Sequence, residues 1–189
     1  MASNDKKGSL NRADALDILD RTIGFINACD NKASIIFGGI GVVFAIVFSS
    51  DGIQKILSIF DAVKKSPSFC GIGYLALLIV SSGVLVLGLV FLILVLIARS
   101  NLPMNETKNF DANSKIFFGH IANRKGYEQY KRAMLKASDE ELLNDVLSQI
   151  YINSMICNKK YKYYNLGLKY SLIGFSALVL LLILGVLFS

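Results

Sequence analysis

The sequence predicts an all-α integral membrane protein with three transmembrane helices and a cytoplasmic helical stalk. The chain has 189 residues, of which 53% are hydrophobic, and its mean hydropathy is +0.51. This composition is apolar for a soluble domain. Three runs contain no Asp, Glu, Lys or Arg, namely Ala33–Ser50, Ser66–Ala98 and Tyr170–Ser189. Because about 20 apolar residues cross the hydrocarbon layer as a helix, each run is a candidate span.

Buried core helices of a soluble bundle are the alternative interpretation. The stretch "YLALLIVSSGVLVLGLVFLILVLIA" has no polar face, and a helix of a soluble bundle usually has one. The first run is short, because its 18 residues rise only about 27 Å as a helix. That length still crosses the membrane when the helix is little tilted. We therefore favour three spans.

The N-terminal elements are a tail, a helix and the first span. Residues 1–9 are polar and are predicted to form a disordered tail. Residues 10–32 are predicted to form a cytoplasmic helix, because apolar residues recur three and four positions apart. These residues are Leu16, Leu19, Ile23 and Ile26. No proline interrupts the sequence up to residue 50, so one continuous helix is expected to enter the first span, residues 33–50.

Residues 51–68 are predicted to form an external loop that contains an interfacial helix, and residues 69–98 form the second span. The helix has one apolar face, made of Ile53, Ile56, Leu57, Phe60 and Val63, and one polar face. This pattern is typical of a helix that lies in the membrane interface. Pro67 ends it. A plain connecting loop is the alternative.

Residues 99–165 are predicted to form a cytoplasmic helical region, followed by the third span at residues 166–189. Ser138 and Glu141 show the spacing of a capping box. No proline follows Pro103, so one helix can run from Asp139 to about Phe188.

Within that long helix, Gly167 and Gly174 are positions where a kink is allowed. The apolar stripes of residues 10–32 and 139–169 need burial, and we expect them to pack against each other.

The distribution of positive charge predicts the orientation. Residues 1–32 contain five Lys and Arg and residues 99–169 contain twelve, whereas the loop between the first two spans contains three. The positive-inside rule places the first two groups in the cytoplasm, so the N-terminus is cytoplasmic and the C-terminus periplasmic. No cleavable signal peptide is expected. Most of the basic residues lie near the membrane surface, which argues against a nucleic-acid partner.

No catalytic or metal site is predicted. The chain has one histidine and three isolated cysteines, Cys29, Cys70 and Cys157, and these do not form a metal-binding or nucleophilic pattern. No acid or base lies in the middle of a span, which argues against a proton-coupled transporter. We therefore expect a protein that is not an enzyme and has no cofactor.

Small residues in the spans are candidates for close helix packing. They are Gly38, Gly41, Ser81 and Gly88. Such residues let helix backbones approach within one subunit or between subunits, and we expect a homo-oligomer in the lipid bilayer. The segment "NKKYKYYNLGLKY" is expected to be an aromatic and basic interface anchor. Binding of an anionic lipid or a nucleotide is its alternative role.

The residues at the start of the first span form a candidate membrane-junction clamp. Asp30 and Lys32 are two positions apart, so they face away from each other on a helix. Lysines at the start of the third span lie at a similar depth, and these are Lys159, Lys160 and Lys162. We expect Asp30 to pair with one of them. The alternative is an exposed, hydrated pair worth less than about 1 kcal/mol.

Three motifs resemble a known family. "ACDNKASIIFGGIGVVFAI", "IFFGHIA" and "LLNDVLSQIYINSMICNKKYKYYNLGLKYSLIGF" occur in this order. They resemble the Pycsar effector transmembrane family, PycTM, over about residues 15–188. The resemblance implies a bacterial inner-membrane effector of a nucleotide-signalled anti-phage defence system. Such an effector impairs membrane integrity after infection and stops growth of the cell.

The resemblance also implies an activating signal, a cyclic pyrimidine mononucleotide. No segment resembles a separate cyclic-nucleotide-binding domain, so the binding site stays unassigned. The candidate signal-sensing segment contains Phe117, Phe118, His120 and Arg124, and a structural role is the alternative for His120. The alternative function is a non-catalytic membrane anchor that docks a soluble partner through its cytoplasmic helices.

Overall fold

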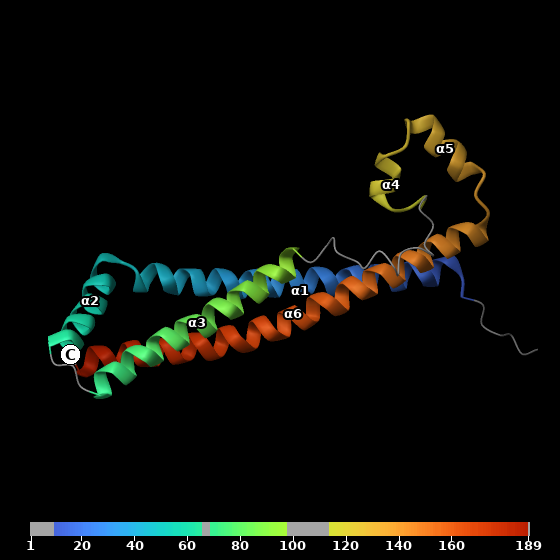
Figure 1. Ribbon diagram of the computed structural model, residues 1–189. Helices are drawn as coiled ribbons and strands as arrows, with labels where there is room; N and C mark the ends of the chain where they lie inside the picture. Colours follow the sequence, from blue (N-terminus) through green and yellow to red (C-terminus); the bar gives the residue numbers. More distant parts are fainter. Residues whose placement is uncertain (1–9, 66–68, 98–113, 189) are drawn as a thin grey trace, which may run out of the picture. The chain divides into compact units, whose positions relative to one another are not determined.

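The computed structural model describes residues 10–65, 69–97 and 114–188, which are helical and contain no strand. The helices are α1 (Arg12–Val47), α2 (Ser50–Lys65), α3 (Phe69–Ile97), α4 (Phe118–Ala122), α5 (Tyr127–Leu135) and α6 (Asp139–Phe188) (Figure 1). The predicted all-α class is confirmed. The predicted tail and the loop around Pro103 lie outside the described residues.

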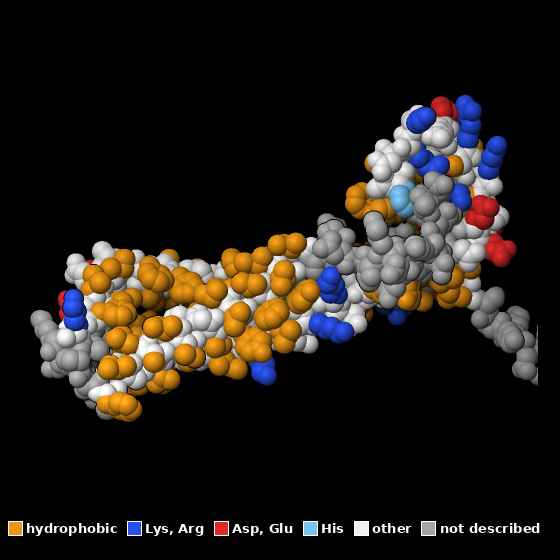
Figure 2. Space-filling model, viewed as in Figure 1, with side chains coloured by type: hydrophobic (Ala, Val, Ile, Leu, Met, Phe, Trp, Pro, Cys, Tyr) orange, Lys and Arg blue, Asp and Glu red, His pale blue; other side chains and the backbone are white. Residues whose placement is uncertain are grey.

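Three helices are long and apolar enough to cross a membrane: α1, residues Gly71–Ile97 of α3 and residues Asp139–Leu187 of α6. Only 11%, 28% and 11% of their most apolar 18-residue windows are buried inside the chain. Hydrophobic side chains cover most of the visible surface of α3 (Figure 2). A soluble bundle would bury such faces. The three faces are therefore lipid-facing, and the alternative of a soluble bundle is wrong.

Helix α1 is continuous, as its uninterrupted sequence predicted. Asn11 caps its start, since the Asn11 side-chain oxygen accepts a hydrogen bond from the Asp14 backbone N–H at 2.9 Å. The helix ends at Val47, three residues before the predicted end of the first span. The next helix begins there because the Ser49 hydroxyl accepts the Gly52 N–H at 3.3 Å. A Cβ at Gly52 would overlap the Val47 carbonyl, so glycine permits this tight turn.

Helix α2 spans Ser50–Lys65, so the predicted helix exists and the alternative of a plain loop is wrong. Helix α6 starts with one half of the predicted capping box, since the Ser138 hydroxyl accepts the Glu141 N–H at 3.2 Å. The Glu141 carboxylate contacts the Lys115 ammonium. The helix then continues to Phe188 through both Gly167 and Gly174. Neither glycine ends the helix.

The chain divides into two compact units, and α1 and α6 contribute to both. Unit 1 contains the chain up to Asn27 and Arg99–Lys159, and unit 2 contains Ala28–Ala98 and Lys160–Ser189. The buried residues of unit 1 are Ala15, Ser114, Leu142, Asp145, Val146 and Gln149. The stripe predicted for the first helix is only partly buried, because Leu16 and Ile23 are each 39% exposed.

In unit 2, α3 and α6 contact each other through small residues. A Cβ at Gly88 would overlap the backbone of Ser171, one at Gly174 would overlap the backbone of Leu85, and one at Gly167 would overlap Leu92. The paired positions run in opposite directions along the two helices, so the helices are antiparallel. This contact accounts for the glycines of α6, which allow a close approach of the two helices.

Candidate functional site

An ion pair joins the first and third spanning helices. Lys160 Nζ on α6 lies 2.5 Å from Asp30 Oδ1 on α1. The Lys160 side chain is 2% exposed and the Asp30 side chain 33% exposed. Among the three lysines named from the sequence, Lys160 is therefore the partner of Asp30. A charge this deeply buried is tolerated when it is paired and hydrogen-bonded.

The pair lies beside a hydrophobic cluster of unit 2. Its fully buried members are Cys29, Ala33, Leu92 and Val95, and Tyr161 and Tyr164 pack against them. Cys29 directly precedes Asp30, and Tyr161 directly follows Lys160. The ion pair thus has apolar neighbours on both helices, which keeps water from the lysine.

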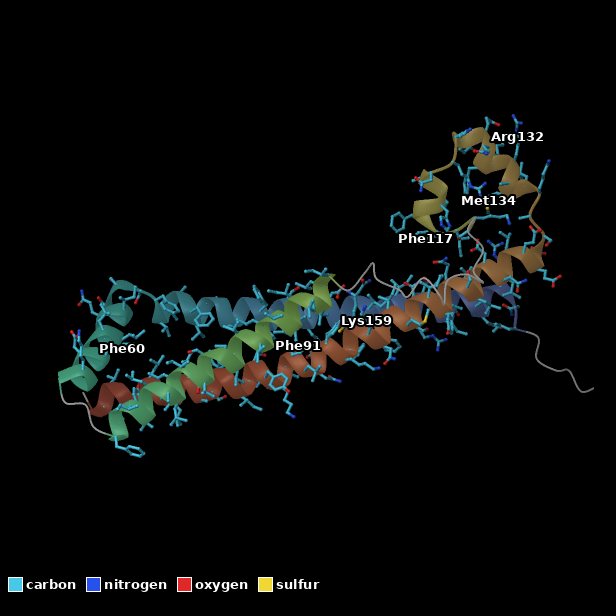
Figure 3. All side chains as sticks on the ribbon, viewed as in Figure 1. Phe60, Phe91, Phe117, Arg132, Met134 and Lys159 are labelled. Atoms are coloured by element: carbon cyan, nitrogen blue, oxygen red, sulfur yellow. The ribbon has the colours of Figure 1, made fainter. Side chains whose placement is uncertain are left out.

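The other clamp residues have different surroundings. Lys32 and Lys162 are exposed, and Lys159, labelled on α6 in Figure 3, is half-buried. Within the described part of the chain, neither Lys32 nor Lys162 forms an ion pair. Of the residues of the candidate clamp, the structure therefore pairs Asp30 with Lys160, and the exposed Lys32 and Lys162 flank them.

In unit 1, the segment before α4 is held by a buried carboxylate. Asp145 Oδ2 on α6 accepts hydrogen bonds from the backbone N–H groups of Lys115 at 2.6 Å and Ile116 at 3.2 Å. The Ser114 hydroxyl accepts the Phe117 N–H at 2.9 Å, and it shares the Ile116 N–H with Asp145, at 3.3 Å. The Lys115 ammonium lies 3.4 Å from Glu141. These contacts attach the segment to α6.

The structure brings three residues of the candidate signal-sensing segment together. The Phe117 and Phe118 rings lie 4.8 Å apart, and the His120 ring meets Phe117 edge-on at 5.3 Å. His120 Nδ1 accepts the Ser114 N–H at 3.1 Å, so a neutral His120 has its proton on Nε2. Phe118 is 72% exposed and Arg124 is half-buried.

The candidate helix-packing residues divide into two groups. Gly88 contacts α6 directly, and Ser81 is buried on the same face of α3. Gly38 and Gly41 of α1 have no atom within 4 Å of the place a Cβ would take. The described residues therefore leave this face of α1 open.

The role of Asp145 is not predicted from the sequence. The available signal was its position on the buried face of α6, one turn after Leu142 and next to Val146. A carboxylate at a core position of an amphipathic helix needs a partner. The described residues contain no group of three or more His, Cys, Asp or Glu side chains that could hold a metal ion.

The three spanning helices and the more polar unit 1 define an all-helical integral membrane protein. A family model described as the Pycsar effector protein domain matches residues 14–188. The chain is also similar to the Pycsar effector protein GmPycTM from Gulbenkiania mobilis. The two are 30% identical over 173 residues, which cover 84% of this chain and 85% of the relative.

No solved structure matches the chain. The chain belongs to the Pycsar effector family, and it is a membrane effector of Pycsar anti-phage defence.

Proposed function

We propose that this effector impairs the integrity of the bacterial inner membrane when unit 1 receives a cyclic pyrimidine mononucleotide, and that it acts without catalysis as a homo-oligomer. In this proposal the N-terminus is cytoplasmic and the C-terminus periplasmic. The Asp30–Lys160 pair is the main support. It joins two spans within the first three residues that each helix contributes to unit 2. A displacement of either helix at this place therefore acts on both spans.

The geometry around α4 supports a role in sensing. Phe118 exposes an aromatic ring next to Phe117, and exposed aromatic rings stack on nucleobases. Lys125 is exposed a few residues further on, and a cation of this kind suits a cyclic phosphate. The hydrogen bonds of Asp145 connect this segment to α6, which continues into unit 2.

Exposed apolar side chains support oligomerisation. Phe25 is 57% exposed and Leu16, Ile18 and Ile23 are each 39% exposed, although all four precede the uncharged part of α1. Apolar side chains clustered on one helix of a polar unit usually mark an interaction surface. The open glycine face of α1 offers a second contact, inside the membrane.

Release of a dye from liposomes tests the proposal. The purified chain is reconstituted in vesicles that hold a self-quenched dye, and cyclic CMP, cyclic UMP or cyclic AMP is added. We expect release with a pyrimidine nucleotide, and mass photometry should show larger assemblies under the same conditions. The Phe118→Ala variant should respond at least about fivefold more weakly, because base stacking contributes about 1–3 kcal/mol. Tyr127→Ala, an equally exposed aromatic position, is the matched control.

Two results would contradict the proposal. Vesicles that stay sealed with every nucleotide, while the same chain still protects cells from phage, would rule out direct activation. Protection without any loss of inner-membrane integrity in cells would favour the alternative function, a membrane anchor for a soluble partner.

A further inference from the structure

Unit 2 contains an apolar groove at the end where α2 lies. The groove has a volume of about 700 Å³ and is lined by residues of α1, α2, α3 and α6. Figure 2 shows a hollow in the surface at this end of unit 2. Phe44 of α1, Phe60 of α2, Leu85 of α3 and Leu182 of α6 represent the four walls, and Phe60 is labelled in Figure 3. The volume lies within the range of about 300–1,000 Å³ that is typical of ligand sites.

The walls admit only an apolar occupant. Among the described residues that line the groove, Ser82 is the one with a polar side chain. Its hydroxyl already donates a hydrogen bond to the Leu78 carbonyl at 2.8 Å. A nucleotide or a cluster of water molecules would therefore lose hydrogen bonds on entering the groove. A hydrocarbon chain would lose none.

The position of the groove indicates the source of that hydrocarbon. Val47 ends the first spanning helix, Leu75 lies near the start of the second, and Leu178 lies late in the third. The groove is thus close to one surface of the hydrocarbon layer. At this depth lipid surrounds the protein at a far higher concentration than a second copy of the chain.

Lys64 of α2 is a cation next to the groove. Ile56 and Phe60 of α2 line it, and Lys64 follows Phe60 on the same row of the helix, four residues later. Lys64 is exposed, and it forms no ion pair with the described residues. We infer that the groove binds a phospholipid, with an acyl chain between α2 and the spans and the headgroup phosphate facing Lys64.

Fluorescence quenching tests this inference independently of nucleotide signalling. The chain has no tryptophan, so Phe60→Trp creates a single reporter in the groove. Val90→Trp is the control reporter. Val90 lies on α3, is 46% exposed and does not line the groove. Each protein in detergent is titrated with phosphatidylglycerol whose acyl chains are brominated, because bromine quenches tryptophan on contact.

We expect quenching of Phe60→Trp to saturate near one lipid per chain, whereas quenching of Val90→Trp should rise only with the ratio of lipid to detergent. Lys64→Gln should raise the lipid concentration for half-quenching about fivefold, the effect of one lysine near an anionic surface. Brominated phosphatidylcholine, which has no net charge, should respond less to Lys64→Gln. Phe44→Trp supplies a second reporter if Phe60→Trp does not fold, as judged by circular dichroism.

Three outcomes would overturn the inference. Superimposable titrations of the groove and α3 reporters would show ordinary contact with solvating lipid. A groove reporter that lipid does not quench, but whose emission changes with protein concentration, would assign the groove to a second copy. If Lys64→Gln did not change the concentration of anionic lipid needed for half-quenching, Lys64 would not contact the headgroup.

Discussion

Asp145 Oδ2 on α6 lies 2.6 Å from the backbone nitrogen of Lys115, a residue 30 positions earlier in the chain. Asp145 is 6% exposed, and its other oxygen, Oδ1, has no hydrogen-bond partner among the described residues. One carboxylate oxygen thus anchors the segment that leads into α4. Because the anchor uses backbone N–H groups, it depends on the charge and position of Asp145 rather than on the side chains it holds.

Asp145→Ala should loosen this segment. The substitution leaves the Lys115 N–H without its acceptor and the Ile116 N–H with only the Ser114 hydroxyl, and an unpaired buried group costs about 1–3 kcal/mol. Hydrogen exchange of these two amides and of α4 should accelerate, while exchange in α3 should not change. Asp139→Ala, at an exposed position in the first turn of α6, is the control. Equal exchange in both variants would show that Asp145 does not anchor the segment.

Asp30→Asn should preserve expression and membrane insertion but change toxicity or phage protection. Removing one charge leaves the buried Lys160 ammonium unpaired, which should destabilise unit 2 by about 3 kcal/mol. This value is at the low end for such a loss because a third of the Asp30 side chain is exposed. Thermal unfolding in detergent measures the loss of stability, and plaque assays measure phage protection.

Exchanging the two charges, with Asp30→Lys and Lys160→Asp together, should restore part of both properties. Lys32→Gln is the matched control, since Lys32 is exposed nearby. Wild-type behaviour of Asp30→Asn in both assays would mean that Asp30 and Lys32 mark only the edge of the membrane.

Gly88→Val should separate α3 from α6. The new side chain would overlap the backbone of Ser171, and overpacking of this kind costs about 1–3 kcal/mol. Gly83→Val, at an open position of the same helix, should be tolerated. Resistance to unfolding in dodecyl sulfate distinguishes the two. Equal resistance would contradict the close contact.

A reporter fused after Ser189 should be active only in the periplasm. The charge distribution of the sequence motivates this expectation, with seventeen Lys and Arg on one side of the predicted spans and three on the other. Alkaline phosphatase, which requires the periplasm, should be active at this position, and a fluorescent protein that folds only in the cytoplasm should be dark. The reverse pattern would invert the topology.

The long helices were predictable because their signals are local. The N-cap at Ser138 and the lack of proline after it fix the start and the continuity of α6, and both agree with the structure. The sequence narrows the partner of Asp30 to Lys159, Lys160 or Lys162, because all three lie at a similar depth. The choice among them needs the rotation of α6 about its axis, which the sequence of that helix does not contain.

Non-local contacts were less predictable. In the sequence, Gly167 and Gly174 are consistent with a kink or with a close contact, and the close contact is visible only once the position of α3 is known. The role of Asp145 also depends on a segment 30 residues away. The open face at Gly38 and Gly41 shows the converse, since a small residue allows close packing but does not require it.

The unequal packing of the spans in unit 2 gives them unequal mechanical roles. Helices α3 and α6 touch backbone to backbone along several turns, and so they form a rigid pair. The first span packs through the buried side chains of Cys29, Ala33 and Ile40, and Asp30 forms its ion pair at the start of this row. No described atom lies within 4 Å of the place that a Cβ would take at Gly38 or Gly41, and Val47, at the end of the helix, borders the groove. A displacement of the first span would therefore separate side chains, whereas a motion that parts α3 from α6 would separate the two backbones at Gly88 and Gly174.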